Sequence, residues 1–540
     1  MAQTLRVRRS ITDLQSDYAA GNKKPLEDLM RAWKGIKELP PQDPRSFFVL
    51  GGYHGEPFRG AGWGSAAWWG GYCNHGNILF PTWHRVYLFE LENALRTIDG
   101  CQDVTLPFWD ETSDESKANG IPWALTVATF DLDGETIPNP LRSFVFPLTI
   151  RDNIHGDDPN YTKRAGYETV RYPLSGLVGT DADRTATKAH NAKFPDYNKN
   201  VGRLDQNIVN WLTSFIVVHG KKHEKNVARA YERCLDAPNY TVFSNTTSAA
   251  QWNTNLPVGT RVVMPLEHPH NDIHLAVGGY DVPSGPNQGD FSPIEGANGD
   301  MGENDTAGLD PIFYFHHAHI DRMFWLWQKR HGFTDRLEVI DGYPGTNSVD
   351  NQGPTPGIHG GAWLTLETPL NPFQKTEDDG SVRPYTSLDC IDIKGQLGYT
   401  YGPGSLDEIV EQEVAAGSDA RVVRVSGINR AAIRGSFVVS VYAEIDGMRQ
   451  CVGREAILSR WSVQGCANCQ THLEARSHFS LEGLDDLNES DLEVEVRTRD
   501  GVLTAASEQA LTPQLAKKPF RVELVTSDEE SPTSLEPVAR

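Results

Sequence analysis

The sequence predicts a large, mainly α-helical domain with long loops, followed by a smaller β-rich domain. Three observations carry this prediction. Apolar residues recur at helical spacing in the N-terminal two thirds, a Gly-, Pro- and Glu-rich stretch interrupts the chain at 402–420, and apolar and polar residues alternate in segments beyond it. A chain of 540 residues has room for about two to four domains of ordinary size.

The N-terminal region predicts three helices. Ser10 is placed to cap the first, which carries Ile11, Leu14 and Tyr18 on one face. Pro25 opens a second helix, since proline is tolerated in the first helical turn. A third run covers residues 44–53, and the Gly- and Trp-rich stretch at 51–76 is then expected to be an ordered functional loop.

Two strong amphipathic helices are predicted farther along, at 82–98 and at 311–330. A shorter helix is expected at 267–277. The region 110–260 is expected to be rich in loops, with one convincing helix near 206–217.

The last part of the chain predicts strands. Period-2 alternation marks 421–425, 436–445 and 492–498. We therefore divide the chain into a helical domain at 1–401, a linker at 402–420, a β-rich domain at 421–527 and a polar tail at 528–540 that is expected to be disordered.

Composition excludes several classes of partner. The chain carries 72 acidic and 50 basic side chains, a net charge of −22, which argues against binding to nucleic acid or to anionic membranes. No apolar run is long enough to span a bilayer, and no secretory signal is visible, so a cytoplasmic protein is expected. The seven cysteines do not suggest a disulfide framework. The sequence does not settle the oligomeric state, and a homodimer is compatible with it.

The histidines are the strongest chemical signal. Of 17, three (His54, His75, His84) lie around the helix at 82–98, and six (His268, His270, His274, His316, His317, His319) lie around the two later helices. His270 and His274 are four residues apart, so both rings lie on one helix face. His219 and His223 have the same spacing but lie in a Lys-rich segment, where solvated side chains are expected.

Two such histidine sets favour copper. Imidazole also suits zinc and iron, but a catalytic zinc would use only one set of three histidines. A di-iron carboxylate bundle would need two Glu-x-x-His pairs, and the chain has one, Glu267-His-Pro-His270.

These motifs resemble those of a known family. Phe80-Pro-Thr-Trp-His84-Arg85, with Glu90 and Glu92 after it, is similar to the first copper motif of tyrosinases and catechol oxidases. His270-Asn-Asp-Ile-His274 and the later segment from Asp310 to Arg322 are similar to the second. The resemblance spans about residues 45–401, and with the C-terminal region the chain resembles a full-length fungal pro-tyrosinase. It implies a four-helix bundle that holds two copper ions in a type 3 centre.

The resemblance also implies ligand roles. His54, His75 and His84 would hold the first copper, and His270, His274 and His317 the second. Cys73 would form a thioether with His75, and Asp321 would orient a ligand imidazole. Phe313 would be the gate residue above the second copper. His316 and His319 are left with a structural or orienting role.

The expected activity is that of a phenol oxidase. In the resembled enzymes dioxygen serves to hydroxylate monophenols to o-diphenols and to oxidise these to o-quinones, the route to melanin. Glu267 and Asn271 match a pair proposed to hold a water that deprotonates the phenol, whose pKa is near ~10. An ordinary helix N-terminal carboxylate is the plainer interpretation of Glu267. Leu275 offers no polar aid to substrate docking.

Several alternatives stay open at this stage. They are a catechol oxidase or o-aminophenol oxidase without useful monophenolase activity, a hemocyanin-like oxygen carrier and a zinc hydrolase. The expected partners are a phenolic small molecule and dioxygen.

The resemblance to pro-tyrosinases implies that the C-terminal region keeps the enzyme latent. Cys466-Ala-Asn-Cys469 is a CxxC pair whose thiolates would select Cu(I), so a copper-loading role is expected, against a structural turn with two free thiols. An apolar side chain from this region would plug the copper pocket, with Ile457, Leu458 or a neighbour as candidates. Proteolysis within 402–420 would then activate the enzyme.

Overall fold

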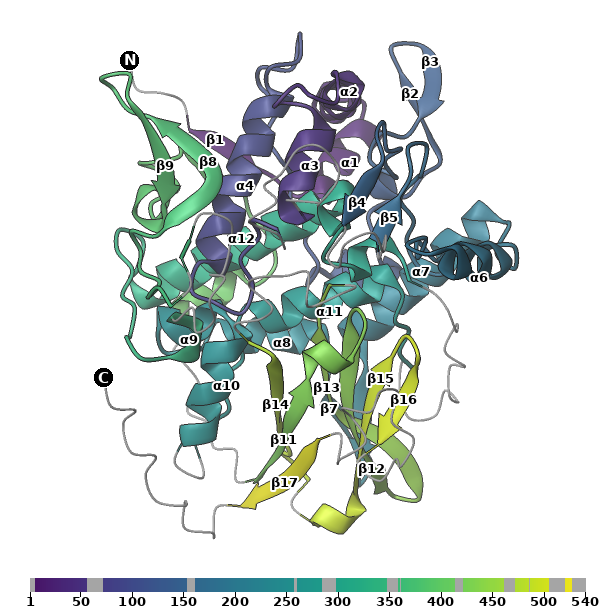
Figure 1. Cartoon of the computed structure of the whole chain (residues 1–540), viewed down its shortest axis with the longest axis vertical. Coiled ribbons are helices and arrows are strands. Elements are labelled where there is room, and N and C mark those ends of the chain that lie inside the picture. Colours follow the sequence, from purple (N-terminus) through teal and green to yellow (C-terminus); the bar gives the residue numbers. More distant parts are fainter. Residues whose placement is uncertain are drawn as a thin grey trace.

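The computed structural model describes residues 5–55, 71–152, 161–256, 260–283, 298–346, 358–359, 361–412, 421–460, 472–484, 486–504 and 520–526. In these residues a helical core lies next to a layer of C-terminal strands, seen at the bottom of Figure 1. The fold combines helices and strands, because small two-stranded sheets form within the segments that connect the helices.

The helices of the described residues can be given in chain order. They are α1 (Ile11–Ala19), α2 (Lys24–Glu38), α3 (Phe47–Gly55), α4 (Phe80–Leu95), α5 (Asp114–Asn119), α6 (Asp181–Asn191), α7 (Tyr197–Thr213), α8 (Val227–Cys234), α9 (Tyr240–Ser244), α10 (Thr246–Asn255), α11 (Glu267–Gly278) and α12 (Ile312–His331). Ser10 caps α1 through a bond from the Asp13 amide, and Pro25 lies in the first turn of α2, as expected.

One expectation is corrected by this order. The region 110–260 contains α5 to α10, where a single helix was expected, and the helix expected at 206–217 ends at Thr213 and gives way to a strand. Most of these helices are short, and a helix of few turns shows too few residues for its periodicity to stand out in the sequence. Asparagine or threonine caps at Asn226, Asn239 and Thr180 nevertheless mark three of their starts.

The strands fall into small pairs and two larger sheets. The N-terminal β1 (Arg6–Arg8) pairs in parallel with β10 (Tyr399–Tyr401). The antiparallel hairpins are β2 (Thr129–Leu132) with β3 (Glu135–Pro138), β4 (Ile150–Asp152) with β5 (Tyr161–Lys163), β6 (Phe215–Val218) with β7 (Lys221–Glu224), and β8 (Pro369–Thr376) with β9 (Val382–Thr386).

The C-terminal strands form two antiparallel sheets, which we call the C-terminal sheets. One has the order β14-β11-β17 and the other β13-β12-β15-β16. Their bounds are β11 (Arg421–Asn429), β12 (Phe437–Ile445), β13 (Met448–Ile457), β14 (Glu474–Ser480), β15 (Leu492–Thr498), β16 (Gly501–Thr504) and β17 (Arg521–Thr526). Their inward-facing residues make a second hydrophobic cluster, which Ile216 and Val218 of β6 join.

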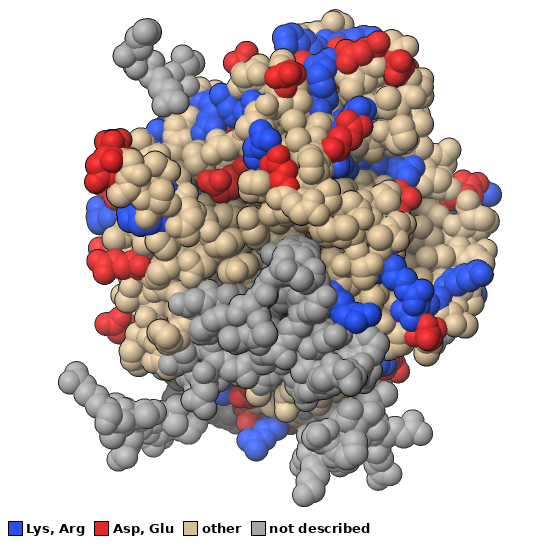
Figure 2. Space-filling view, turned by 45° about the horizontal axis from the view of Figure 1, so that its top comes forward, with Lys and Arg blue, Asp and Glu red and all other residues tan. Residues whose placement is uncertain are grey.

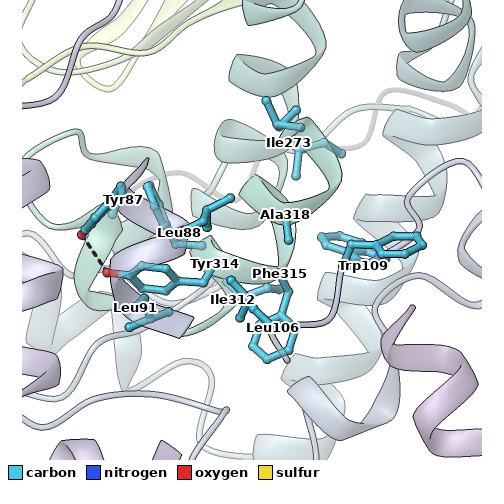
Figure 3. Close-up of a cluster of buried hydrophobic side chains, with 14 of the residues drawn as sticks. Tyr87, Leu88, Leu91, Leu106, Trp109, Ile273, Ile312, Tyr314, Phe315 and Ala318 are labelled. Carbon is cyan, nitrogen blue, oxygen red and sulfur yellow. Dashed lines mark hydrogen bonds between the residues drawn. The ribbon is translucent and has the colours of Figure 1, made fainter. Parts of the chain in front are cut away.

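The central helices are buried on every side. Every residue of α11 is buried, and so is α12 from Ile312 to Gln328. A helix that is buried all round lies in the core of its domain. Figure 3 shows part of this core, where the hydroxyls of Tyr87 on α4 and Tyr314 on α12 lie 2.7 Å apart. Tyr87 also donates to the Leu50 carbonyl at 2.6 Å, which ties α3 to the same core.

The expected linker is partly docked. The Ser405 amide donates to Asp110 at 2.7 Å, and Arg322 of α12 pairs with Asp407 at 2.6 Å. Residues up to Gln412 are therefore anchored to the helical core. Residues 413–420 and the tail from 527 on lie outside the described residues.

The visible surface carries mixed charge. In Figure 2 lysine and arginine lie among aspartate and glutamate over the described part of this face, without one large basic patch. Among the described helices, none combines the length and the apolar character that crossing a membrane requires.

Candidate metal centre

Three histidines from separate segments meet at the first candidate site. His54 lies near the end of α3, His75 on the loop before α4, and His84 on α4. Their ring centroids are 5.3 Å apart for His54 and His75, 5.7 Å for His54 and His84, and 5.1 Å for His75 and His84. The expected first triad is therefore brought together.

Backbone contacts explain why His54 reaches this place. The helix α3 approaches the turn at 307–309 so closely that a Cβ on Gly308 would lie 2.7 Å from the Gly51 carbonyl and 2.8 Å from the His54 Cβ. Glycine at both positions permits the approach, because any side chain there would displace the helix.

Hydrogen bonds at Nδ1 fix the tautomers of two of these rings. His54 Nδ1 donates to the Asn304 carbonyl at 3.0 Å, and His84 Nδ1 donates to the Phe80 carbonyl at 2.8 Å. The opposite nitrogens, Nε2 of His54 and of His84, are buried and have no hydrogen-bond partner among the described residues. A buried nitrogen with a free lone pair fits a metal ligand whose orientation is set from its other side.

The second triad is tighter. His270 and His274 lie one turn apart on α11, and His317 lies on α12. The Nε2 atom of His317 is 3.1 Å from that of His270 and 3.2 Å from that of His274. His274 Nδ1 donates to the Met301 carbonyl at 2.8 Å, and His270 Nδ1 lies 2.9 Å from the Asn271 side-chain oxygen. Three imidazole nitrogens thus converge on one point.

Burial keeps these rings neutral. It lowers the pKa of His84 to about 3, and it lowers the pKa of His270 and of His317 well below the usual value. A neutral imidazole has the lone pair that a metal needs. The donor set, histidine nitrogens with one cysteine sulfur beside the first triad, fits copper, as argued from the sequence.

The two triads adjoin each other. The rings of His84 and His317 stack at 4.5 Å, and those of His75 and His270 lie 5.5 Å apart. Phe313 packs between the triads, with its ring 3.9 Å from His317 and 4.9 Å from His54. Two ions held here would lie side by side among the same aromatic residues.

Cys73 lies beside the first triad. Its sulfur and one ring nitrogen each from His54 and His75 all lie within 4.8 Å of one another. The Asn304 side-chain amide donates to this sulfur at 3.5 Å, and burial raises the pKa of the Cys73 thiol to about 11. In the described part of the chain the cysteines are free thiols. Cys466 and Cys469 lie outside the described residues.

Glu267 is buried at the start of α11 and joins two neighbouring segments. One carboxylate oxygen accepts from the Gly76 amide at 2.8 Å, next to His75, and the other accepts from the Thr246 amide at 2.8 Å. Burial raises the pKa of Glu267. Asn271 is buried as well, and its side-chain oxygen lies against His270.

Asp321 has a different role from the one expected. Its carboxylate pairs with Arg85 at 2.5 Å and accepts from the hydroxyls of Tyr399 and Tyr401 at 2.6 Å each. It contacts Arg8 as well. The expectation that it orients a ligand imidazole does not agree with these contacts. Backbone carbonyls or Asn271 bond to the Nδ1 atoms of four of the ligand rings, and Nδ1 of His317 is buried without a hydrogen-bond partner among the described residues. Asp321 instead joins α12 to α4 and to the parallel pair of β1 and β10.

Two sets of partners were missed from the sequence. The first set is the carbonyls of Met301 and Asn304, which orient ligand histidines. A backbone acceptor cannot be recognised from residue types. Glu111 is the other: it lies 2.6 Å from His316 Nδ1 and accepts from Tyr231. A carboxylate two residues after the Pro-Phe-Trp of 107–109, together with a histidine left over in the segment of α12, was the available signal.

The C-terminal sheets contact the copper-ligand segments. The Ala456 amide of β13 donates to Asp272, between His270 and His274, at 3.0 Å. Leu458 is buried in the cluster of the helical core, whereas its neighbour Ile457 belongs to the cluster of the C-terminal sheets. Of the two expected plug candidates, Leu458 is therefore the one that faces the helical core.

Comparison with known proteins agrees with this geometry. The model of the common central domain of tyrosinase matches residues 44–330. The chain is 53% identical to tyrosinase HcTyr2 of Hahella sp. over 96% of this chain and 98% of that one. It is 45% identical to a tyrosinase of Aspergillus oryzae over 91% and 90%.

Solved structures give the same result. A tyrosinase from Burkholderia thailandensis superimposes with a TM-score of 0.80 at 48% identity, over 96% of this chain and 100% of that one. A pro-tyrosinase of Aspergillus oryzae, at 18% identity over 97% and 94%, has a TM-score of 0.64 and shares the fold.

Proposed function

The chain belongs to the tyrosinase family, and from that premise we propose that it is a latent dicopper phenol oxidase acting on monophenols and o-diphenols. The observation that carries the proposal is the convergence of three Nε2 atoms, 3.1 and 3.2 Å apart, beside a second histidine triad. His54, His75 and His84 would hold one copper, and His270, His274 and His317 the other. The copper pair supplies the redox chemistry by which dioxygen oxidises the phenol.

The residues around the triads suit a phenolic substrate. Phe313 offers its ring to an aromatic guest beside His317, and the buried walls exclude water. A phenol must lose its hydroxyl proton to bind as phenolate near neutral pH. Glu267 and Asn271 are the polar groups on α11 proposed to hold the water that takes this proton, and burial raises the pKa of Glu267 toward the range of a general base.

A second candidate function is oxidation of o-diphenols without hydroxylation. It is favoured by the bonds of Glu267, because both of its carboxylate oxygens already accept from Gly76 and Thr246. A carboxylate engaged in this way has less capacity for a catalytic water. An o-diphenol is more acidic and depends less on such a base.

The proposed latency rests on the contacts between the helical core and the C-terminal sheets. Residues 421–526 would act as a shielding domain, with Leu458 directed at the helical core and Ala456 bonded to Asp272. The activating cut is proposed to fall within the linker 402–420, C-terminal to Asp407, which pairs with Arg322 of the helical core. The thioether of Cys73 and His75, and copper loading by Cys466 and Cys469, remain predictions.

One preparation tests these proposals. The chain reconstituted with copper is assayed on tyrosine, catechol and an o-aminophenol, before and after limited proteolysis. Quinone from both tyrosine and catechol, rising after cleavage, supports the proposal. Activity on catechol alone selects the second candidate, and full activity of the intact chain would refute latency.

A further inference from the structure

Arg460 follows β13 in the C-terminal sheets, yet its side chain is buried in the helical core. Its exposed fraction is 0%, one guanidinium nitrogen lies 2.7 Å from the Asp305 carboxylate, and another donates to the Gly55 carbonyl at 2.7 Å. Burying an arginine is unfavourable unless its charge is paired and its donors are used. The planar fork of guanidinium suits the holding of two groups at once.

These two partners lie on either side of one copper ligand. Gly55 is the residue after His54 in the chain. Asp305 is the residue after Asn304, whose carbonyl accepts the Nδ1 proton of His54 at 3.0 Å. Arg460 therefore fixes both the backbone that carries this imidazole and the backbone that orients it.

A backbone contact strengthens the same link. The Asn304 amide donates to the carbonyl of Ser459, the residue before Arg460, at 3.3 Å. The Asn304 side chain also reaches Cys73, beside the first triad. The turn that orients His54 is thus held by two consecutive residues of the C-terminal sheets.

We propose that Arg460 is a positioning residue for the copper ligand His54, so that the first site holds copper more tightly while the C-terminal sheets are docked on the helical core. The inference rests on the proposed copper centre. Outer partners of metal-bound histidines typically change metal affinity by about 10- to 100-fold when they are removed. Loss of Arg460 should therefore weaken the first copper site and leave the second unchanged.

The alternative is that Arg460 simply fastens the two parts of the chain. Arg497 is the matched control, because it forms a similar ion pair between the C-terminal sheets and the helical core. It donates from β15 to the Asp281 carbonyl at 2.9 Å and pairs with the Asp281 carboxylate at 2.6 Å. Among the described residues, Asp281 lies outside the turn 300–306 that orients the ligands. A fastening role predicts similar effects of Arg460→Ala and Arg497→Ala.

The test uses the full-length chain, freed of metal and titrated with copper against a competing chelator. A His317→Ala background isolates the first site, and a His84→Ala background isolates the second. Arg460→Ala, Arg460→Lys and Arg497→Ala are compared in both. We expect Arg460→Ala to lower first-site affinity by about 10- to 100-fold, Arg460→Lys to lower it less because one prong is kept, and Arg497→Ala to change neither site.

Other results would overturn the inference. Parental affinity at the first site in Arg460→Ala, or equal loss at both sites, would assign Arg460 a fastening role only. If Arg460→Ala does not fold, Arg460→Lys carries the test with the same criterion. A parent chain that binds no copper in either background would refute the proposed function together with the inference.

Discussion

The ring of Phe313 stacks on the imidazole of His317 with their centroids 3.9 Å apart. The stack places an aromatic surface against both triads, where a phenol ring would dock. Replacing Phe313 by leucine keeps the site apolar but opens space beside His317. We expect the catalytic efficiency of the cleaved enzyme to rise several-fold for a bulky o-diphenol relative to catechol. Steady-state kinetics with both substrates measures this ratio.

The neighbouring Phe315 supplies the control for that experiment. It lies on the same helix but stacks on Trp33, away from the histidines. Phe315→Leu should lower stability by about 1 kcal/mol or more and leave the substrate ratio unchanged. An equal change of the ratio in both variants would contradict the gate role of Phe313.

Adjacent histidines on α12 should differ in copper binding. His317→Gln removes a nitrogen that lies within 3.2 Å of two other ligands, so the second copper should be lost. His316 also has a ring nitrogen within 4.8 Å of the ligand atoms of His270, His274 and His317, but its Nδ1 pairs with Glu111, so His316→Gln should cost about 1–3 kcal/mol while both coppers stay bound. Metal analysis and thermal unfolding separate the two outcomes. Loss of copper in His316→Gln alone would show that the ligand assignment on α12 is reversed.

A second contact of the C-terminal sheets should affect the other copper. The Ser436 hydroxyl donates to the Gly302 carbonyl at 2.7 Å, and the preceding carbonyl, of Met301, accepts from His274. Ser436→Ala should therefore weaken the second site by up to about tenfold and spare the first. Copper titration in a His84→Ala background measures the effect. An unchanged second site would show that the turn keeps its place without this hydroxyl.

The pH dependence of stability should carry the signature of Glu111. Burial raises the pKa of Glu111 to about 8, above the model-peptide value near ~4.3. The folded state then holds a proton that the unfolded state releases, so this group lowers the free energy of unfolding as pH rises from about 4.3 to 8. Glu111→Gln should remove this decline, on the order of a few kcal/mol. Thermal unfolding of the copper-free chain across that range checks it, and parallel curves would contradict the assignment.

Leu458 should control latency more than Ile457 does. Leu458→Ala removes contacts with the helical core, about 2–5 kcal/mol for a buried leucine, and should raise the activity of the intact chain. Ile457→Val trims the core of the C-terminal sheets and should leave activity low. Catechol oxidation before proteolysis measures both. If the two variants are equally latent, Leu458 does not hold the sheets in place.

The two histidine sets could be predicted from the sequence because histidines gather around a few helices, whereas the choice of three ligands in each set followed from the resemblance to tyrosinases. His270 and His274 lie one turn apart, and both copper helices are unusually aromatic. The helices α6, α8 and α9 were missed, since helices this short depend on contacts with the rest of the fold. Met301 and Asn304 act through backbone carbonyls, which leave no trace in residue type. Asp321 was misassigned because its partners Arg8 and Tyr399 are far away in the chain.

The contacts of the C-terminal sheets with the helical core could not be predicted from the sequence either, because they join residues far apart in the chain. Nothing in the residues around Arg460 indicates that it enters the helical core more than 400 positions from Gly55. Only the fold brings the two together. The alternation of β12 and β15, by contrast, was predictable because it depends on neighbouring residues alone.

The copper content of the full-length chain after reconstitution tests the central claim most directly. The account predicts two copper ions per chain, falling to one in either His84→Ala or His317→Ala, because each variant breaks one triad. Copper that does not bind, or a stoichiometry that is the same in the parent and both variants, would contradict it.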